Sequence, residues 1–98
     1  ILGYTSHMGA GAVTSNVKSD YSLITVRVEE NDSIKRIKTG FNILGAALGD
    51  YVEVGCNSVL CPGCVIGKKT TIYPSNMVRG FIPSNFIYKN PSEIIPKQ

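Results

Sequence analysis

The amino-acid sequence predicts an all-β chain: a parallel β-helix (a hexapeptide-repeat solenoid) with an inserted β-hairpin and a short C-terminal tail. The main observation is a fixed period of six residues, and a fixed period must be settled before other patterns are interpreted. The second observation is a stretch of period two, and the third is that no long 3.6-residue period occurs. An aliphatic residue recurs at six unbroken places: Leu48, Val54, Leu60, Ile66, Ile72 and Val78.

Each six-residue unit has the same internal pattern. Glycine follows the aliphatic residue at Gly49, Gly55 and Gly67. Three units, each a short strand and a corner, would close one triangular coil, and every coil needs neighbours to bond to. We expect glycine to relieve unusual backbone dihedrals. We expect a second inward place near the corner, where a large side chain would be overpacked. Small or β-branched residues occupy this place: Val52, Ser58, Cys64, Thr70 and Asn76.

The chain begins with two more units in a common phase. Leu2 and Met8 take the aliphatic place, and Gly3 and Gly9 follow them. The pattern then stops in a polar, turn-prone segment. We therefore assign residues 1–16 to an N-terminal coil segment.

Residues 17–41 predict a β-hairpin inserted at a corner of the coil. Between Tyr21 and Gly40 the period becomes two, with many β-branched residues, as in a strand. The polar cluster 30–33 predicts the turn, and the charged return strand would protect an exposed edge. The alternative is an irregular loop, against which the density of β-branched residues argues.

The repeat resumes in residues 42–83, and residues 84–98 form a C-terminal extension. Within that extension we expect about one helical turn between Pro91 and Pro96, with Pro91 at its first position and Pro96 ending it. The 98 residues are long enough for a single domain at most. Because the chain starts inside the repeat pattern, we expect it to be a fragment of a longer one.

Composition narrows the classes of function. The formal charge of +3 suits an anionic small ligand, and no aromatic-interleaved basic motif indicates nucleic acid. No apolar run approaches the roughly 18–20 residues of a membrane span. We expect a cytoplasmic protein with no nucleic-acid or membrane partner, and reduced cysteines follow from that compartment.

The three cysteines, Cys56, Cys61 and Cys64, lie close together in the sequence. Cys61 and Cys64 form a C-x-x-C motif, which in redox proteins opens a helix whose dipole lowers a thiol pKa. Here the motif lies inside the repeat, which favours a structural use. Redox chemistry and zinc binding are the alternatives, although zinc would need Cys56 and His7 to converge with the motif. We expect no metal in this domain.

The repeat resembles the left-handed β-helix of hexapeptide acyltransferases. The order Met8-Gly-Ala-Gly, Asn16, an insertion, Gly45 and then Gly49-Asp50 narrows the resemblance further. It is similar to the C-terminal acetyltransferase domain of bifunctional UDP-N-acetylglucosamine pyrophosphorylase/glucosamine-1-phosphate acetyltransferases and of related sugar nucleotidyltransferases. These proteins make a cell-wall precursor. The similarity covers nearly the whole chain.

The resemblance implies a homotrimer that binds acetyl-CoA, as cosubstrate, and an amino sugar phosphate at the seams between subunits. The family's general base, a histidine upstream of the Gly-Ala-Gly segment, is not in this chain, so the catalytic residue is unknown and His7 is a weak candidate. Lys68, Lys69 and Lys89 could meet the phosphates of the coenzyme, or simply be solvated corners. The resemblance carries over five binding residues by position: His7, Ala10, Asn16, Cys56 and Pro74. Lys89 is added to them as a candidate contact for the coenzyme phosphates.

Two functions follow as hypotheses. The first is an acyltransferase-type domain of a sugar-nucleotide-biosynthesis protein, in which an amine attacks the thioester directly. The second is a non-catalytic trimerisation and ligand platform, attached to a nucleotidyltransferase domain outside this chain.

Overall fold

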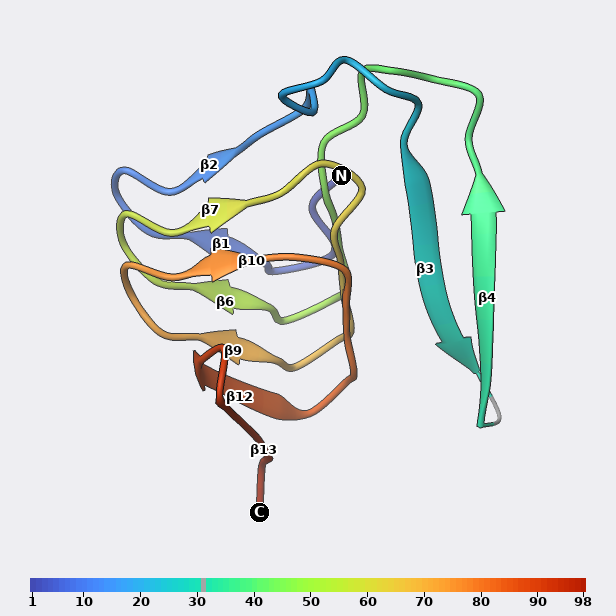
Figure 1. Cartoon of the computed structure of the whole chain (residues 1–98). Coiled ribbons are helices and arrows are strands. Elements are labelled where there is room, and N and C mark those ends of the chain that lie inside the picture. The colour runs from blue at the N-terminus through green and yellow to red at the C-terminus, as the bar shows by residue number, and fades with distance from the viewer. Residues whose placement is uncertain (31) are drawn as a thin grey trace.

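The computed structural model describes residues 1–30 and 32–98 and confirms the all-β parallel β-helix with its inserted hairpin (Figure 1). Asn31, part of the turn predicted inside the hairpin, lies outside the described residues. The described residues contain no helix, and hence none long and apolar enough to cross a membrane.

Short parallel strands, most of them two residues long, stack into three walls of a triangular coil. Each wall is reached by every third unit, and inter-coil pairing fixes the register, for example His7 with Glu53 and Glu53 with Thr71. The first wall holds β1 (His7–Met8), β6 (Glu53–Val54), β9 (Thr71–Ile72), β12 (Phe86–Asn90) and β13 (Glu93–Pro96). The second wall holds β2 (Val13–Thr14), β7 (Val59–Leu60) and β10 (Met77–Val78), and the third holds β5 (Ala47–Leu48), β8 (Val65–Ile66) and β11 (Phe81–Ile82).

The core follows the two inward places of the repeat. The six aliphatic residues from Leu48 to Val78 are all buried, as are the five residues of the small place. Full burial of an aliphatic side chain contributes about 1.5–3 kcal/mol, so the aliphatic column is the main stabilising element. Polar members of the small place are satisfied by corner carbonyls: Thr70 Oγ1 donates to Pro83 O over 2.7 Å, and Asn76 Nδ2 donates to Lys89 O over 3.0 Å.

The glycines after the aliphatic residues do not relieve backbone strain, so that expectation is wrong. The left-handed conformation falls two residues later in each unit, for example at Tyr51 (φ 59°) and Lys69 (φ 60°). The glycines instead lie where neighbouring coils nearly touch. A Cβ at Gly49 would lie 2.8 Å from the backbone nitrogen of Lys68, a distance that real Cβ atoms do not adopt.

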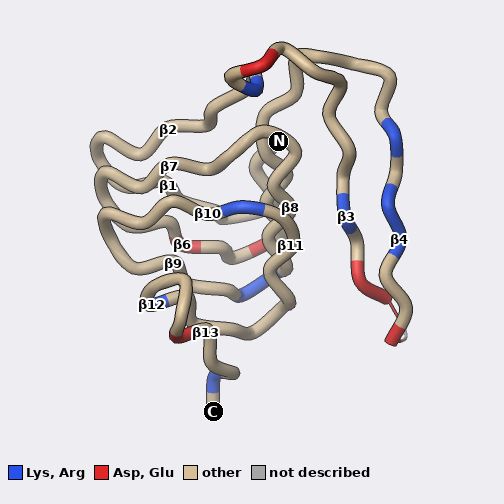
Figure 2. The backbone as a smooth tube through the Cα atoms, in the orientation of Figure 1, with Lys and Arg blue, Asp and Glu red and all other residues tan. Residues whose placement is uncertain are grey.

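The hairpin consists of β3 (Thr25–Glu30) and β4 (Ser33–Lys38), paired antiparallel from Thr25 with Lys38 to Glu30 with Ser33. Ile24, just before β3, is fully buried and packs over Gly63 at a coil corner. β3 lies beside β8 and β11 of the third wall (Figure 2). β4 is exposed along its whole length. The hairpin therefore stands against the third wall and leaves the first and second walls open.

The C-terminal segment forms a strand, so the expected helical turn between Pro91 and Pro96 is wrong. β13 pairs antiparallel with β12. The turn is set by Asn90, whose Oδ1 accepts the Ser92 N–H at 2.8 Å and whose Nδ2 donates to Glu93 at 3.0 Å. An asparagine that bonds the backbone two residues later favours a tight turn over a helix start.

Candidate functional site

Three of the five residues carried over by resemblance lie in one row. Ala10, Cys56 and Pro74 occupy the same corner place on three successive coils, between the first and second walls. Backbone hydrogen bonds hold the row together, from Asn57 N to Ala10 O at 3.0 Å and from Ser75 N to Cys56 O at 2.9 Å. We call this row the Ala10 edge. Its side chains are small and exposed, and they form a row, or track, along the coil.

Lys89 lies beside the far end of the Ala10 edge, where Asn90 takes the place that follows Pro74 in the row. Because Tyr88 pairs with Ile72, Lys89 is aligned with Tyr73 on the neighbouring coil. Coils in a β-sheet stack are about 4.8 Å apart, so the track from Ala10 to Lys89 is about 14 Å long. One cationic residue thus lies beside the far end of a row of small residues.

His7 lies on the outer face of the first wall, beside the other end of the Ala10 edge. Its Nδ1 is 3.3 Å from Glu53 Oε2, and the two side chains are 67% and 60% exposed. The Glu53 carboxylate is therefore placed to attract a proton on Nδ1, an arrangement that would leave Nε2 as the acceptor. Glu53 is the residue that sequence reasoning missed at this site.

Two predicted elements lie elsewhere in the chain. Asn16 is exposed at the corner where the hairpin leaves the second wall, and its carbonyl accepts the Leu44 N–H at 2.8 Å. Lys68 and Lys69 lie on the edge between the third and first walls. They therefore do not share an edge with Lys89, and one coenzyme phosphate group cannot use all three lysines of a single chain.

Cys64 has the surroundings of a core residue. Its side chain is fully buried, and burial, reinforced by Cys61, raises the pKa of its thiol to about 12. A thiol with that pKa stays protonated at neutral pH and is a poor nucleophile or metal ligand. This supports the structural interpretation of the C-x-x-C motif. Among residues 1–30 and 32–98, no group of three or more His, Cys, Asp or Glu side chains is arranged to hold a metal ion.

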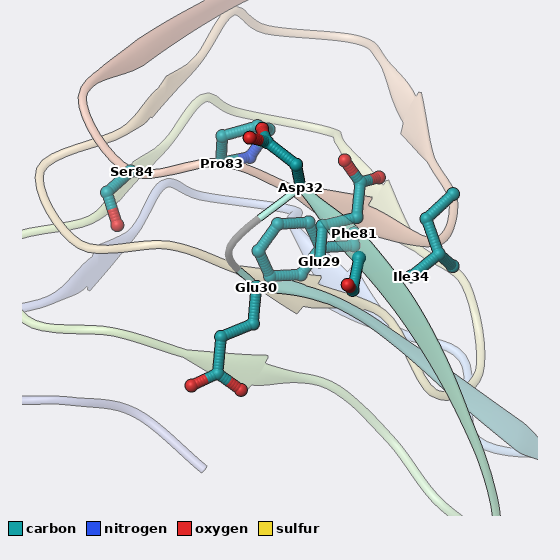
Figure 3. Close-up of a pocket in the computed structure, with 8 residues that line it drawn as sticks. Glu29, Glu30, Asp32, Ile34, Phe81, Pro83 and Ser84 are labelled. Atoms are coloured by element: carbon teal, nitrogen blue, oxygen red, sulfur yellow. The ribbon is translucent and has the colours of Figure 1, made fainter.

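Two hollows lie between the hairpin and the coil, away from the Ala10 edge. The larger, of about 520 Å³, is lined by the hairpin tip together with Phe81, Pro83 and Ser84 (Figure 3). Its carboxylates, from Glu29, Glu30 and Asp32, do not converge on one point in Figure 3. The smaller, of about 240 Å³, is mostly apolar and lies at the hairpin base. None of the residues carried over by resemblance lines either hollow.

Comparison with known proteins supports the acetyltransferase class. No protein-family model matches the chain. The bifunctional sugar-1-phosphate nucleotidylyltransferase/acetyltransferase of Sulfurisphaera tokodaii is 36% identical over 78 residues, which are 80% of this chain and 18% of that protein. The bifunctional protein GlmU of Methanococcus vannielii is 26% identical over 100% of this chain and 23% of its own length. The uncharacterized acetyltransferase YaiX of Escherichia coli is 29% identical over 86% of this chain and 35% of its own.

Among solved structures, the crystal structure of the polySia-specific acetyltransferase NeuO matches the fold with a TM-score of 0.59 at 21% identity. The match covers 98% of this chain and 50% of NeuO. The fold and the repeat thus define a hexapeptide-repeat β-helix domain of the acetyltransferase type. Its homologues are GlmU-type bifunctional nucleotidyltransferase/acetyltransferases and related acetyltransferases. The chain spans only about a fifth to a third of the curated relatives' length.

Proposed function

We propose that this domain transfers an acetyl group from acetyl-CoA to the amine of an amino sugar phosphate. The observation that carries the proposal is the Ala10 edge, a track of small residues with an imidazole beside one end and an amine cation beside the other. Its length of about 14 Å is comparable with an extended pantetheine arm. Lys89 would attract the coenzyme phosphates, as a compact point charge.

The chemistry proposed is direct transfer. The acceptor amine attacks the thioester carbonyl carbon, a C–N bond forms, and the C–S bond breaks as CoA leaves. His7 Nε2 takes the proton that the amine loses and can return it to the leaving thiolate. Glu53 keeps the imidazole in the tautomer with Nε2 free, and positioning of the two substrates supplies most of the remaining rate.

A track that binds acetyl-CoA should be blocked by a large side chain at its centre. We expect Cys56→Trp to weaken acetyl-CoA binding at least tenfold, measured by calorimetric titration of the longest natural chain that contains this domain. Ser84→Trp is the matched control, because Ser84 is exposed at the same corner place of another edge. The affinity of this variant for acetyl-CoA should stay within twofold of that of the unaltered protein. No heat on adding acetyl-CoA to the unaltered protein would contradict the proposal and favour a non-catalytic ligand platform.

We also propose that the domain assembles as a homotrimer through the second wall. The outward residues of this wall form an apolar ladder, in which Val13 and Met77 both pair with Val59. Val13 is 50% and Met77 is 56% exposed in the single chain. This ladder adjoins the Ala10 edge, so a neighbouring subunit packed there would cover the track and complete a site at the seam.

The trimer can be tested by light scattering. We expect three times the mass of one chain for the unaltered protein, and a shift to monomer for the double variant Val13→Glu, Met77→Glu, because buried unpaired carboxylates are costly. Ile94→Glu is the control, since Ile94 is an exposed apolar residue of β13, outside the ladder. A stable monomer of the unaltered protein at micromolar concentration would show that the assembly is wrong.

A further inference from the structure

The edge between the third and first walls carries an aromatic pair next to lysines, and the proposed acetyl transfer does not use it. Tyr4 and Tyr51 lie on adjacent coils with ring centroids 5.6 Å apart and planes at 82°. Tyr4 is 69% and Tyr51 is 48% exposed. Each ring therefore keeps much of its surface open to solvent. We call this row the Tyr51 edge.

Backbone hydrogen bonds set the spacing along the Tyr51 edge. Tyr51 N donates to Tyr4 O at 2.8 Å, and Lys69 N donates to Asp50 O at 2.8 Å. The two tyrosines and the two lysines, Lys68 and Lys69, thus occupy three successive coils, about 4.8 Å apart. On the next two rungs Asn85 N donates to Lys68 O, and Lys97 N donates to Asn85 O. The spacing is that of the coil itself, so the backbone of these residues is held in place without a ligand.

Both lysines of this edge are exposed. Within residues 1–30 and 32–98, neither Lys68 nor Lys69 forms an ion pair. One carboxylate, that of Asp50, also lies on this edge beside Lys68, and its Oδ1 accepts the Tyr4 N–H at 2.7 Å. Figure 2 shows acidic and basic residues together on the hairpin. The Tyr51 edge instead carries two lysines and one carboxylate beside two exposed rings. Such an edge suits a ligand with one flat group and one strongly anionic group.

We propose that the Tyr51 edge binds a nucleoside diphosphate, with the base against the tyrosine rings and the phosphates at Lys68 and Lys69. Every base has a π-face that stacks on an aromatic side chain, and lysine is a common phosphate partner. The strip from the rings to the lysines spans only one to two coil spacings, or roughly 5–10 Å. A single nucleotide fits that length, whereas a nucleic-acid strand needs a groove several nucleotides long.

The site is separate from the track proposed for acetyl-CoA. The Ala10 edge lies between the first and second walls, and the Tyr51 edge lies on the opposite margin of the first wall. One chain can therefore hold both ligands at once. The proposal does not depend on acetyl transfer, and either can fail without the other.

The test uses UDP, ADP and inorganic pyrophosphate as probes in calorimetric titrations of the longest natural chain. We expect UDP or ADP to bind at least tenfold more tightly than pyrophosphate. Tyr4→Ser with Tyr51→Asn should remove most of that difference, and asparagine tolerates the positive φ at position 51. Lys68→Ala with Lys69→Ala should weaken nucleotide binding about tenfold or more. Lys35→Ala with Lys38→Ala, which removes two exposed hairpin lysines, is the matched control and should stay within twofold.

Three results would overturn the proposal. The first is no binding of either nucleotide to the unaltered protein. The second is equal affinity for pyrophosphate and nucleotides, which would reduce the edge to a general anion patch. The third is competition, in which acetyl-CoA displaces UDP or ADP in the lysine-dependent site, because the edge would then belong to the coenzyme. Acetyl transfer by the tyrosine variant should remain unchanged, so these outcomes are read independently of the proposed function.

Discussion

Replacing His7 with asparagine is expected to lower acetyl transfer by about 10²–10⁴-fold, the usual contribution of a positioned general base. Asparagine keeps a polar side chain of similar size but cannot take the amine proton. The loss should fall on kcat, while KM for acetyl-CoA stays within about threefold, because His7 lies beside the track and not in it. Steady-state kinetics of the longest natural chain, with glucosamine 1-phosphate as the probe acceptor, would measure both.

Glu53→Gln tests the same mechanism with a smaller expected effect. It retains a hydrogen-bond acceptor toward His7 Nδ1 but removes the carboxylate charge, and we expect a smaller loss of kcat, about tenfold. Both side chains are more than half exposed, so neither change should shift the melting temperature by more than about 2 °C. Full activity of His7→Asn in a stable protein would place the base elsewhere.

Gly67→Ala is expected to give the largest loss of stability. Its Cβ would lie 2.8 Å from the Pro83 carbonyl carbon and closer still to the backbone nitrogen of Ser84 on the next coil. Because backbone atoms cannot move aside without breaking the stack, we expect the free energy of unfolding to fall by about 3 kcal/mol. For a chain of this size that corresponds to roughly 10 °C or more in melting temperature, measured at fixed protein concentration.

Gly45→Ala is the matched control. The new Cβ would meet only the Thr14 side chain, at 3.6 Å or more, and Gly45 does not have a positive φ. The substitution should be neutral or stabilise the protein by a few tenths of a kcal/mol, through the entropy of the unfolded chain. If both alanine variants have the same melting temperature as the unaltered protein, the close approach between coils is not what selects glycine after the aliphatic residue.

The repeat made most of the coil predictable. Two inward places per unit, read from spacing alone, correspond to the buried residues from Leu48 to Val78. The glycine role was wrong because spacing marks a position but does not say whether a dihedral or a neighbour restricts it. The last coil could not be predicted from the period of six. Val78 and Ile82, both inward, are four residues apart, since Arg79 and Gly80 alone make that corner.

The site was predictable only in part. Ala10, Cys56 and Pro74 share a corner place because their units are three apart once the hairpin is left out of the count. The same count places Glu53 beside His7. This pairing follows from the repeat, but no short sequence motif marks it. What spacing could not supply is which exposed side chains turn toward each other, such as the two tyrosines, since corner rotamers are not set by the hexad.

The hairpin shows how such a molecule can acquire new parts. It leaves the coil at Asn16 and returns at Leu44, and one backbone hydrogen bond of 2.8 Å joins the two points. The coils above and below this junction therefore keep the same geometry, whichever segment connects Asn16 to Leu44. Since lengthening a loop costs only about 0.6 kcal/mol per doubling, segments of very different size can be exchanged at this corner. The solenoid can thus diversify at one junction while its inherited core stays unchanged.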